Sequence, residues 1–503
     1  MNFSFKTVLI MFYLALIFSC AVRSYPPGGE EDISPPKLTK VSPDANSKNL
    51  SNDIGIDIWF DEMLNPNTVQ SSITIEPNIE FNITVSGNKI AISPLNHWPE
   101  GMFKIFISRS LTDYSSNMNS LDYPIELLFS TTDYFLNSKI EGKIFNSDST
   151  KIYQASLLDN DLNIISITDV DIQNYFKFSG VDIINDNFFI FVCENKVTSP
   201  LDDIRSKKYG ISQSFIDNKF QSIYISNPLN KAMINSISLK NNHYGEIVLS
   251  NNKKIPFILN NMFFSGLVNQ TDDFYYYDYN FLDSLNIIIE EKNQLEKYTI
   301  NYKYMFSDFL DTISPILGNH FFDKDSYFLE FDEPVLFDNK KSFKSNNKVI
   351  NYKYITPLKI QLSISEFDTI QIEAFYIKDL SGNILSDSLL VIQKNVLPVL
   401  ENYIPGEING LINYNGEQKI YVEIINSITK KVYKQLLDDL TFKFNDLESG
   451  NYYIFAYENI NKIGNEYFSG MLDPLKLSAK FVMYDKMVSV RSNWINSIEL
   501  KFE

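Results

Sequence analysis

The stretch Ile56-Asp57-Ile58-Trp59-Phe60-Asp61-Glu62-Met63 places three apolar residues at every second position and then ends in two acidic residues. Alternate side chains of a strand point to the same face, so Ile56, Ile58 and Phe60 should be buried together. The same pattern returns as Tyr-Phe-Leu-Glu-Phe-Asp-Glu-Pro at positions 327–334. The chain therefore contains two copies of a strand that is buried on one face and ends in an acidic turn.

Three other stretches also return in the same order, at spacings of 264 to 268 residues, close to the 271 of the first pair. The pairs are 113–118 with 379–384, 140–144 with 408–412, and 189–195 with 453–459. This repetition predicts a pair of modules that occurs twice. The modules are named A1 (33–132), B1 (133–215), A2 (311–396) and B2 (397–503). The unpaired segment between them is also rich in strand-like sequence and is expected to form a further sandwich, C (216–310).

The secondary structure is expected to be strands nearly throughout. Segments rich in Ile, Phe, Tyr and Val alternate with clusters of Asn, Asp, Ser, Gly and Pro, which is typical of all-β sandwiches. The expected strands include 54–60, 104–107, 188–192, 419–425, 452–457 and 488–490. No stretch carries a capped amphipathic helix. At most a short helical turn is expected within 206–215 or 365–368.

The N-terminus resembles an export signal. Residues 1–19 carry one charge, Lys6, and then the apolar run Val8 to Phe18, which is too short to span a membrane as a helix. The run ends in Ile-Phe-Ser-Cys, which resembles a bacterial lipobox with Cys20 as the lipidated residue. Residues 20–32 would then form a polar tether. The alternative is an ordinary cleaved signal that happens to precede a cysteine.

The net charge and the cysteine content limit which binding partners and which disulfides are expected. The chain of 503 residues has 44 Lys and Arg against 62 Asp and Glu, giving a net charge of −18. Such a surface repels nucleic acid, so no nucleic-acid partner is expected. Lipidation of Cys20 would leave Cys193, the other of two cysteines, without a disulfide partner. Its apolar surroundings predict a buried structural thiol. Trp494 is expected to fill a sandwich core or an inter-domain seam, with a ligand platform as the alternative.

Two families resemble these modules. A1 is similar to the bacterial SbsA-type Ig-like domain in Ser34-Pro35-Pro36, in 56–63, and in the late turn from Asp113 to Asn117; the second copy keeps that family's turn glycine as Gly382. B2 resembles the carboxypeptidase regulatory-like, or transthyretin-like, sandwich in 408–412 and 447–457. The whole order is similar to Ig-like domain-containing lipoproteins of Gram-negative bacteria. The resemblance implies tandem Ig-like and transthyretin-like β-sandwiches attached to the cell envelope.

No catalytic residue is assigned. The pairs Asp61-Glu62 and Asp332-Glu333 could bind Ca²⁺ together with Asp113 or Asp379, or could be solvated turn residues. His97, His243 and His320 lack metal-site spacing, and the sequence has no phosphate loop or nucleophile motif. The aromatic run at 274–279 suggests either a sugar- or peptide-binding surface or a strand with alternating rings. No cofactor and no metal are therefore predicted, while calcium at the acidic turns stays open.

The expected function is non-catalytic. The sequence favours a cell-envelope lipoprotein, anchored to the outer membrane on its periplasmic or surface side, that acts as a structural, adhesive or scaffold protein. The alternative is a surface module that binds glycan or peptide. Its partners are expected to be the membrane, through the lipid, and envelope proteins or glycans. The ligand and the oligomeric state are not specified by the sequence.

Overall fold

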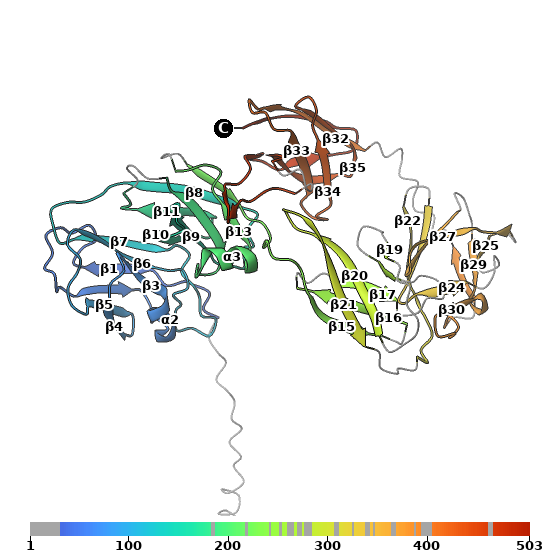
Figure 1. Ribbon diagram of the computed structural model, residues 1–503, viewed down its shortest axis with the longest axis horizontal. Helices are drawn as coiled ribbons and strands as arrows, with labels where there is room; N and C mark the ends of the chain where they lie inside the picture. Colours follow the sequence, from blue (N-terminus) through green and yellow to red (C-terminus); the bar gives the residue numbers. More distant parts are fainter. Residues whose placement is uncertain are drawn as a thin grey trace, which may run out of the picture. The chain divides into compact units, whose positions relative to one another are not determined.

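A computed structural model describes most of the chain: residues 31–182, 187–216, 220–240, 243–250, 254–258, 266–268, 274–275, 284–305, 311–323, 326–337, 343–345, 348–363, 369–386, 389–393, 405–460 and 466–502. The chain divides into two compact units, which are described separately (Figure 1). The first comprises residues 1–197 and 214–225, and the second comprises residues 198–213 and 226–503.

Module A1 is a two-sheet sandwich in the first unit. Its sheets have the strand orders β1-β2-β5-β4 and β3-β6-β7. The elements are β1 (Leu38–Ser42), β2 (Ile56–Phe60), α2 (Pro66–Ser72), β3 (Ile73–Glu76), β4 (Phe81–Ser86), β5 (Lys89–Pro94), β6 (Met102–Ile107) and β7 (Ile125–Ser130). Ile56, Ile58 and Phe60 enter the core between the sheets, as the alternation predicted. Trp98 stacks on Phe103 there, with ring centroids 4.5 Å apart.

Module B1 packs a sheet containing β10-β9-β12 against the sheet β11-β8-β14. Its strands are β8 (Lys139–Phe145), β9 (Tyr153–Leu158), β10 (Ile164–Asp169), β11 (Tyr175–Ser179), β12 (Phe189–Glu194) and β14 (Gln221–Tyr224). Strand β14 pairs in parallel with β8, so B1 extends past its predicted end at residue 215. Residues 198–213 meanwhile belong to the second unit. The predicted boundary is displaced because a repeat shows only what both copies share.

Segment C combines a sheet and a hairpin around one core. The sheet has the order β15-β16-β17-β18-β19, and β20 pairs with β21. The strands are β15 (Ile234–Leu239), β16 (Tyr244–Leu249), β17 (Lys254–Ile258), β18 (Gly266–Val268), β19 (Phe274–Tyr275), β20 (Ser284–Lys292) and β21 (Lys297–Met305). Phe257 from the sheet and Ile287 from the hairpin lie in the same buried cluster. The two layers therefore pack face to face.

Module A2 repeats the buried strand of A1. Tyr327, Leu329 and Phe331 of β23 enter its core. The elements are β22 (Leu317–Asp323), β23 (Ser326–Phe331), β24 (Val335–Phe337), β25 (Phe343–Ser345), β26 (Lys348–Val349), β27 (Tyr352–Thr356), β28 (Lys359–Leu362), β29 (Thr369–Glu373), the 3-10 helix η1 (Ala374–Tyr376), β30 (Ile377–Asp379) and β31 (Leu389–Gln393). The strand orders are β22-β23-β28-β27, β26-β25-β29-β31 and β24-β30.

Module B2 is a sandwich of the sheets β35-β32-β41 and β34-β33-β36-β39, with β40 also paired to β36. Its strands are β32 (Gly406–Asn413), β33 (Ile420–Asn426), β34 (Val432–Leu436), β35 (Thr441–Leu447), β36 (Gly450–Glu458), β37 (Met471–Leu472), β38 (Leu475–Lys476), β39 (Phe481–Met483), β40 (Val488–Val490) and β41 (Ile495–Lys501). The second unit also contains α3 (Pro200–Ser206) and β13 (Tyr209–Ile211). Within this unit, the Tyr209 hydroxyl donates to the Gly470 carbonyl.

The all-β fold class of tandem sandwiches is confirmed. Two short helices, α2 and α3, occur where no helix was predicted, and each begins with a proline at its first turn. The side chain of Asn65 caps α2 by accepting from the Asn67 amide. An Asn-Pro pair is thus the local signal that could have found α2. Among the described residues, no helix has the length and apolar character needed to cross a membrane.

Candidate metal centre and interdomain interface

The late turn of A1 is organised by a buried carboxylate. Asp113 is fully buried. Its Oδ1 accepts hydrogen bonds from the amides of Ser115 and Asn119, at 3.2 and 2.9 Å, and its Oδ2 accepts from Asn119 Nδ2 at 2.8 Å. Burial alone would raise the pKa of Asp113, but the hydrogen bonds from Ser115 and Asn119 outweigh it and lower that pKa. The carboxylate is therefore held in its charged form.

The same turn occurs in A2 and corrects one residue of the predicted repeat. Asp379 Oδ1 accepts from the Asn383 amide at 2.8 Å, and Asp379 Oδ2 accepts from Asn383 Nδ2 at 2.7 Å. The structural partner of Asn383 is therefore Asn119, whereas the sequence comparison paired it with Asn117. A1 carries two more residues in this turn, and a comparison without gaps cannot show such an insertion.

Each A module brings three carboxylates together in an acidic triad. The first triad is Asp32, Glu62 and Asp113, and the second is Asp311, Glu333 and Asp379. In each triad, one carboxylate oxygen from every member lies within 4.8 Å of the others. The structure thus brings Glu62 close to Asp113, and Glu333 close to Asp379, as one of the two interpretations of the acidic pairs requires. The first triad has an exposed member, Asp32, while the second has none.

The other predicted acidic residues lie outside the triads. Asp61 Oδ1 accepts from the Lys37 amide at 2.7 Å, and Asp332 Oδ1 accepts from the Ile316 amide at 2.8 Å. These two carboxylates fasten the start of each A module to the end of its buried strand. Their role is structural, and it explains why the Asp-Glu pair occurs twice.

The third member of each triad was missed by sequence reasoning. Asp32 and Asp311 each precede an A module, and each accepts at Oδ1 from the amide two residues later, at 3.0 Å. They appear in the sequence as the acidic residue ahead of Ser-Pro in both copies. This shared position could have identified Asp32 and Asp311 as candidates. It did not show that the chain folds back to Glu62 or Glu333.

The crowding of negative charge has an electrostatic consequence. The pKa of Glu62 is raised, first by burial and then by the nearby charges of Asp113, Asp32 and Asp61. An ionised Glu62 therefore costs folding free energy at neutral pH unless a cation compensates it. In the second unit, burial lowers the pKa of His243, against the opposing influence of Asp379 and Asp311.

Oxygen donors of this kind suit a hard divalent cation. Ca²⁺ takes about 6–8 oxygen ligands from carboxylates, carbonyls and water. Three carboxylates supply the charge for such a site, and water would have to complete the coordination. Neither triad includes a histidine or cysteine, which disfavours zinc. The earlier prediction of no metal stays untested.

The structure also locates the remaining candidate residues. Cys193 is fully buried, as predicted. Trp494 is 52% exposed and stacks with Arg491, 4.8 Å from the ring centroid. The prediction that it fills a core or a seam is therefore wrong, because it lies in a turn ahead of β41. Cys20 and the residues before it lie outside the described part of the chain. Of the aromatic run 274–279, residues 274–275 form β19 and the rest lie outside as well.

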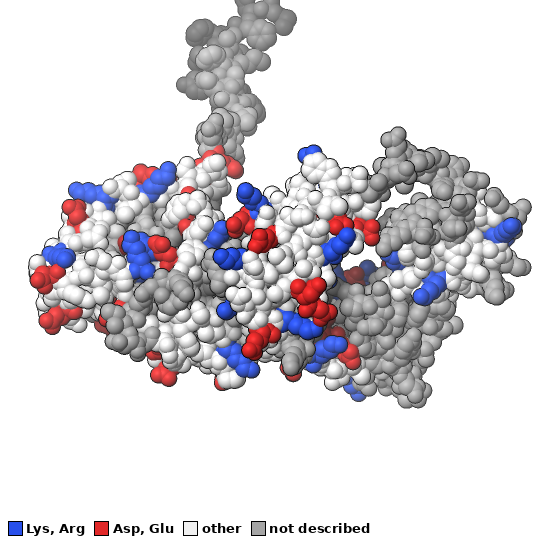
Figure 2. Space-filling model, turned by 90° about the horizontal axis from the view of Figure 1, so that it is seen from above, with Lys and Arg blue, Asp and Glu red and all other residues white. Residues whose placement is uncertain are grey.

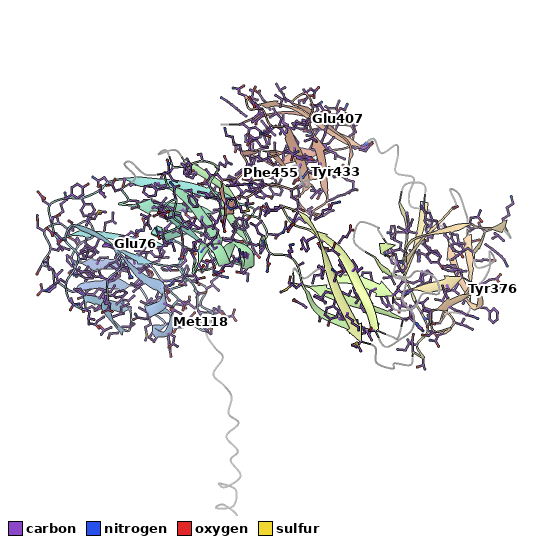
Figure 3. All side chains as sticks on the ribbon, viewed as in Figure 1. Glu76, Met118, Tyr376, Glu407, Tyr433 and Phe455 are labelled. Carbon is purple, nitrogen blue, oxygen red and sulfur yellow. The ribbon has the colours of Figure 1, made fainter. Side chains whose placement is uncertain are left out.

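A buried ion pair of A1 also forms hydrogen bonds to B1 inside the first unit. Lys104 of β6 is 3% exposed. Its Nζ lies 2.8 Å from Glu76 Oε2 and 3.6 Å from Glu126 Oε1, both in A1, and it donates to Ser166 Oγ of B1 at 2.7 Å. The Ser166 hydroxyl donates in turn to Glu76 Oε2 at 2.8 Å. Figure 3 shows Glu76 where the strands of the two modules meet.

A buried carboxylate of B1 also forms hydrogen bonds to A1 at the same seam. Asp169 is 1% exposed. Its Oδ2 accepts from the Ser108 hydroxyl at 2.5 Å and from the Arg109 amide at 2.7 Å, both in A1. Burial raises the pKa of Asp169, opposed by these hydrogen bonds and by Arg109. The seam is thus built from charged groups that all find partners, which fixes the two sandwiches in one arrangement.

On the face shown in Figure 2, the described charged residues form a mixed surface. Figure 2 shows acidic and basic side chains interspersed over the face in view. Exposed ion pairs such as Lys89–Asp57, 2.8 Å apart with about a third of each side chain exposed, belong to this mixed surface. Such a surface keeps a protein in solution and does not create the positive field that nucleic acids require.

Comparisons with known proteins find little similarity in sequence or structure. The chain matches no curated protein. The solved structures that match include part of native α2-macroglobulin from Escherichia coli, at 10% identity over 44% of this chain and 78% of the other, with a TM-score of 0.16. The TIE protein of Bacillus anthracis matches at 10% identity over 100% of this chain and 80% of the other, with a TM-score of 0.13. Scores this low support no functional argument.

One comparison concerns a defined part of the chain. A family described as "Bacterial Ig-like domain" matches residues 32–131. The match begins at Asp32 of the first acidic triad and ends one residue after β7. It thus includes the buried strand, the Asp113 turn and the A1 side of the buried seam. In the span from 32 to 131, the protein is similar to the bacterial Ig-like domains.

Proposed function

We propose that the protein is a non-catalytic lipoprotein of the bacterial cell envelope. In this proposal Cys20 carries the lipid, and tandem Ig-like and transthyretin-like sandwiches act as a structural, adhesive or scaffold element. The lipid would anchor the chain to the outer membrane, on its periplasmic or surface side. The match of residues 32–131 to bacterial Ig-like domains supports this general class.

The observation that carries the proposal is the buried seam between A1 and B1. Sandwiches joined by flexible linkers move independently, and interfaces between domains of one chain are usually modest. Here Lys104 and Asp169 are buried and Glu76 is partly buried, and all three form hydrogen bonds across the seam. A seam of this kind makes two domains into one stiff body, which suits a protein that holds a surface in a fixed position.

The arrangement of polar groups supports a non-catalytic role. The polar residues common to both A modules bond to turns and to the start of the module, as Asp61, Asp332, Asp113 and Asp379 do. Catalysis would require a positioned base, nucleophile or metal in a site that excludes water. Cys193, which has the chemistry of a nucleophile, is buried within β12.

The test combines anchoring with partner capture. Intact cells that produce the full chain are crosslinked, and its partners are identified by mass spectrometry beside a Cys20→Ser variant. We expect a reproducible set of envelope partners. We also expect Cys20→Ser to stop labelling by fatty acid, to release the chain from the membrane fraction and to lose those crosslinks. Continued labelling of the variant would disprove the anchor.

A separate result would disprove the non-catalytic role. It is hydrolysis of a polysaccharide or a peptide by the purified protein, lost when Asp61, Glu62, Asp332 and Glu333 are replaced by Ala while the fold is kept. Those four residues are the acidic pairs that occur in both copies. Retention of the fold is checked by circular dichroism, since Asp61 and Asp332 also fasten each module.

A further inference from the structure

A cleft of about 670 Å³ opens in the first unit where A1 meets B1. One wall comes from β7 and the residues just before it, and the other comes from β8, β10, β11 and Phe220, which directly precedes β14. Strands β10 and β11 are the edges of the two B1 sheets, so the cleft lies over the open side of that sandwich. Its volume falls in the range of about 300–1,000 Å³ that is typical of small-ligand sites.

Three exposed aromatic rings line this cleft. Tyr123 is 49% exposed, Tyr175 is 41% exposed and Phe220 is 55% exposed. Tyr175 and Phe220 meet edge to face, with centroids 6.3 Å apart. Lys143 Nζ lies 4.9 Å from the Tyr175 centroid, which holds that ring in place. Large rings left this open beside a cavity cost hydration free energy, and a ligand that covers them would recover it.

Acidic, basic and hydroxyl side chains lie beside the rings. Glu141 and Lys177 are exposed on the two neighbouring strands β8 and β11, and Asp171 is half-buried. Thr168 also lines the cleft; it is fully buried, and its Oγ1 has no hydrogen-bond partner among the described residues. A buried hydroxyl without a partner costs free energy that a bound hydroxyl group could restore.

We propose that this cleft binds a neutral oligosaccharide. A sugar ring presents a face of C–H groups, which packs on an aromatic ring, and hydroxyls that both donate and accept hydrogen bonds. Carboxylates accept from such hydroxyls, while Lys177 donates to them. Because carboxylates outnumber the one lysine in the lining, the cleft does not favour an anionic ligand. This role goes beyond the scaffold function and does not depend on it.

A peptide fits the cleft less well. A peptide added to a sheet bonds a row of main-chain groups along one strand edge and places alternate side chains in closed pockets. Here the rings come from three separate elements, and they stand open at the rim. Their arrangement provides flat surfaces for stacking along the length of a flexible chain of sugars.

The test measures binding of defined sugars to the full chain. Maltohexaose, cellohexaose, laminarihexaose and chitohexaose are each titrated by calorimetry, with saturation-transfer NMR to detect contact with sugar protons. We expect at least one to bind at millimolar concentration or below. Tyr175→Ala and Phe220→Ala should each weaken that binding by about tenfold. Tyr114→Ala, which removes a 66% exposed ring of A1 that is not part of the cleft lining, should leave it unchanged.

Three outcomes would overturn the proposal that the cleft binds an oligosaccharide. Absence of binding by all four sugars at millimolar concentration overturns the proposal, as does binding that Tyr175→Ala and Phe220→Ala leave intact. Capture of extended peptides at the cleft, sensitive to Tyr175→Ala and without sugar binding, overturns it as well. If Tyr175→Ala fails to fold, Tyr175→Leu keeps an apolar side chain and still removes the flat ring, so weakened binding by that variant is expected instead.

Discussion

Replacement of Lys104 by Met should destabilise the first unit strongly and in a pH-dependent way. The Lys104 side chain is 4% exposed, and its partners Glu76 and Glu126 are 20% and 10% exposed. Removal of one partner from a buried ion pair costs about 3–5 kcal/mol, because the remaining charge stays buried. For a unit of about 150–250 residues, each kcal/mol lowers Tm by about 2–4 °C, so the expected fall is about 6–20 °C.

The pH dependence follows from Glu126. Burial raises the pKa of Glu126, and Lys104 is the largest influence that lowers it. Without Lys104 the pKa of Glu126 rises further, so ionised Glu126 destabilises the folded variant at neutral pH. This destabilisation decreases on acidification, because Glu126 becomes protonated. The difference in unfolding free energy between variant and parent should therefore be largest at neutral and alkaline pH, and shrink on acidification toward the ordinary carboxyl pKa of 4.5.

The assay is calorimetry of the full chain across this pH range, with Lys89→Met as the matched control. Lys89 is also a strand lysine of A1 paired with a carboxylate, but about a third of that pair is exposed, so its loss should cost less than about 1 kcal/mol. Equal effects of the two substitutions, or a cost of Lys104→Met that does not change with pH, would refute the reasoning.

Three further outcomes test the turns, the triads and the second unit. Asn119→Ala should cost about 1–3 kcal/mol in chemical denaturation, because buried Asp113 loses the Nδ2 donor of Asn119 at its Oδ2, whereas Asn117→Ala should cost less than about 0.5 kcal/mol. In EDTA, Glu62→Gln should raise Tm at neutral pH and should leave Tm unchanged below the ordinary carboxyl pKa of 4.5. If the same substitution lowers Tm when Ca²⁺ is added, but not in EDTA, the triad binds the ion. Fragment 311–503, which lacks the fully buried Tyr209 and its hydrogen bond to Gly470, should melt below fragment 198–503; equal melting points would show that this contact does not stabilise the second unit.

The sequence predicted the parts of the fold that depend on local pattern. Alternation alone placed Ile58, Phe60, Leu329 and Phe331 in their cores, because a strand has only two faces. The repeat located the acidic turns, and left open whether Glu62 lies close to Asp113. It failed at the insertion near Asn117, and at β14, which pairs with a strand far back along the chain.

The buried seam was beyond prediction for a different reason. Lys104 interrupts an otherwise apolar strand, and a lone lysine there is compatible with a surface position. Its partners Glu76 and Ser166 lie on other strands, 28 and 62 positions away. The corresponding strand of A2, β29, contains no lysine, so the repeat gave no indication. The cleft could not be predicted either, since Tyr175 and Phe220 come together only when β11 and β14 join one sheet, and Tyr123 lines the same cleft from A1.

The contacts of Asp32 define how the first domain would carry mechanical load. Its backbone carbonyl accepts from Asn117 Nδ2 and Asn119 Nδ2, each at 3.0 Å, and a few residues later the Lys37 amide is held by Asp61. Tension applied to the chain ahead of Asp32 would reach these side-chain bonds before it reached the pairing of β1 with β2. They can give way one at a time and release about 3.3 Å of chain per residue. The domain thus has a short extensible leader that yields under force while its sandwich stays folded.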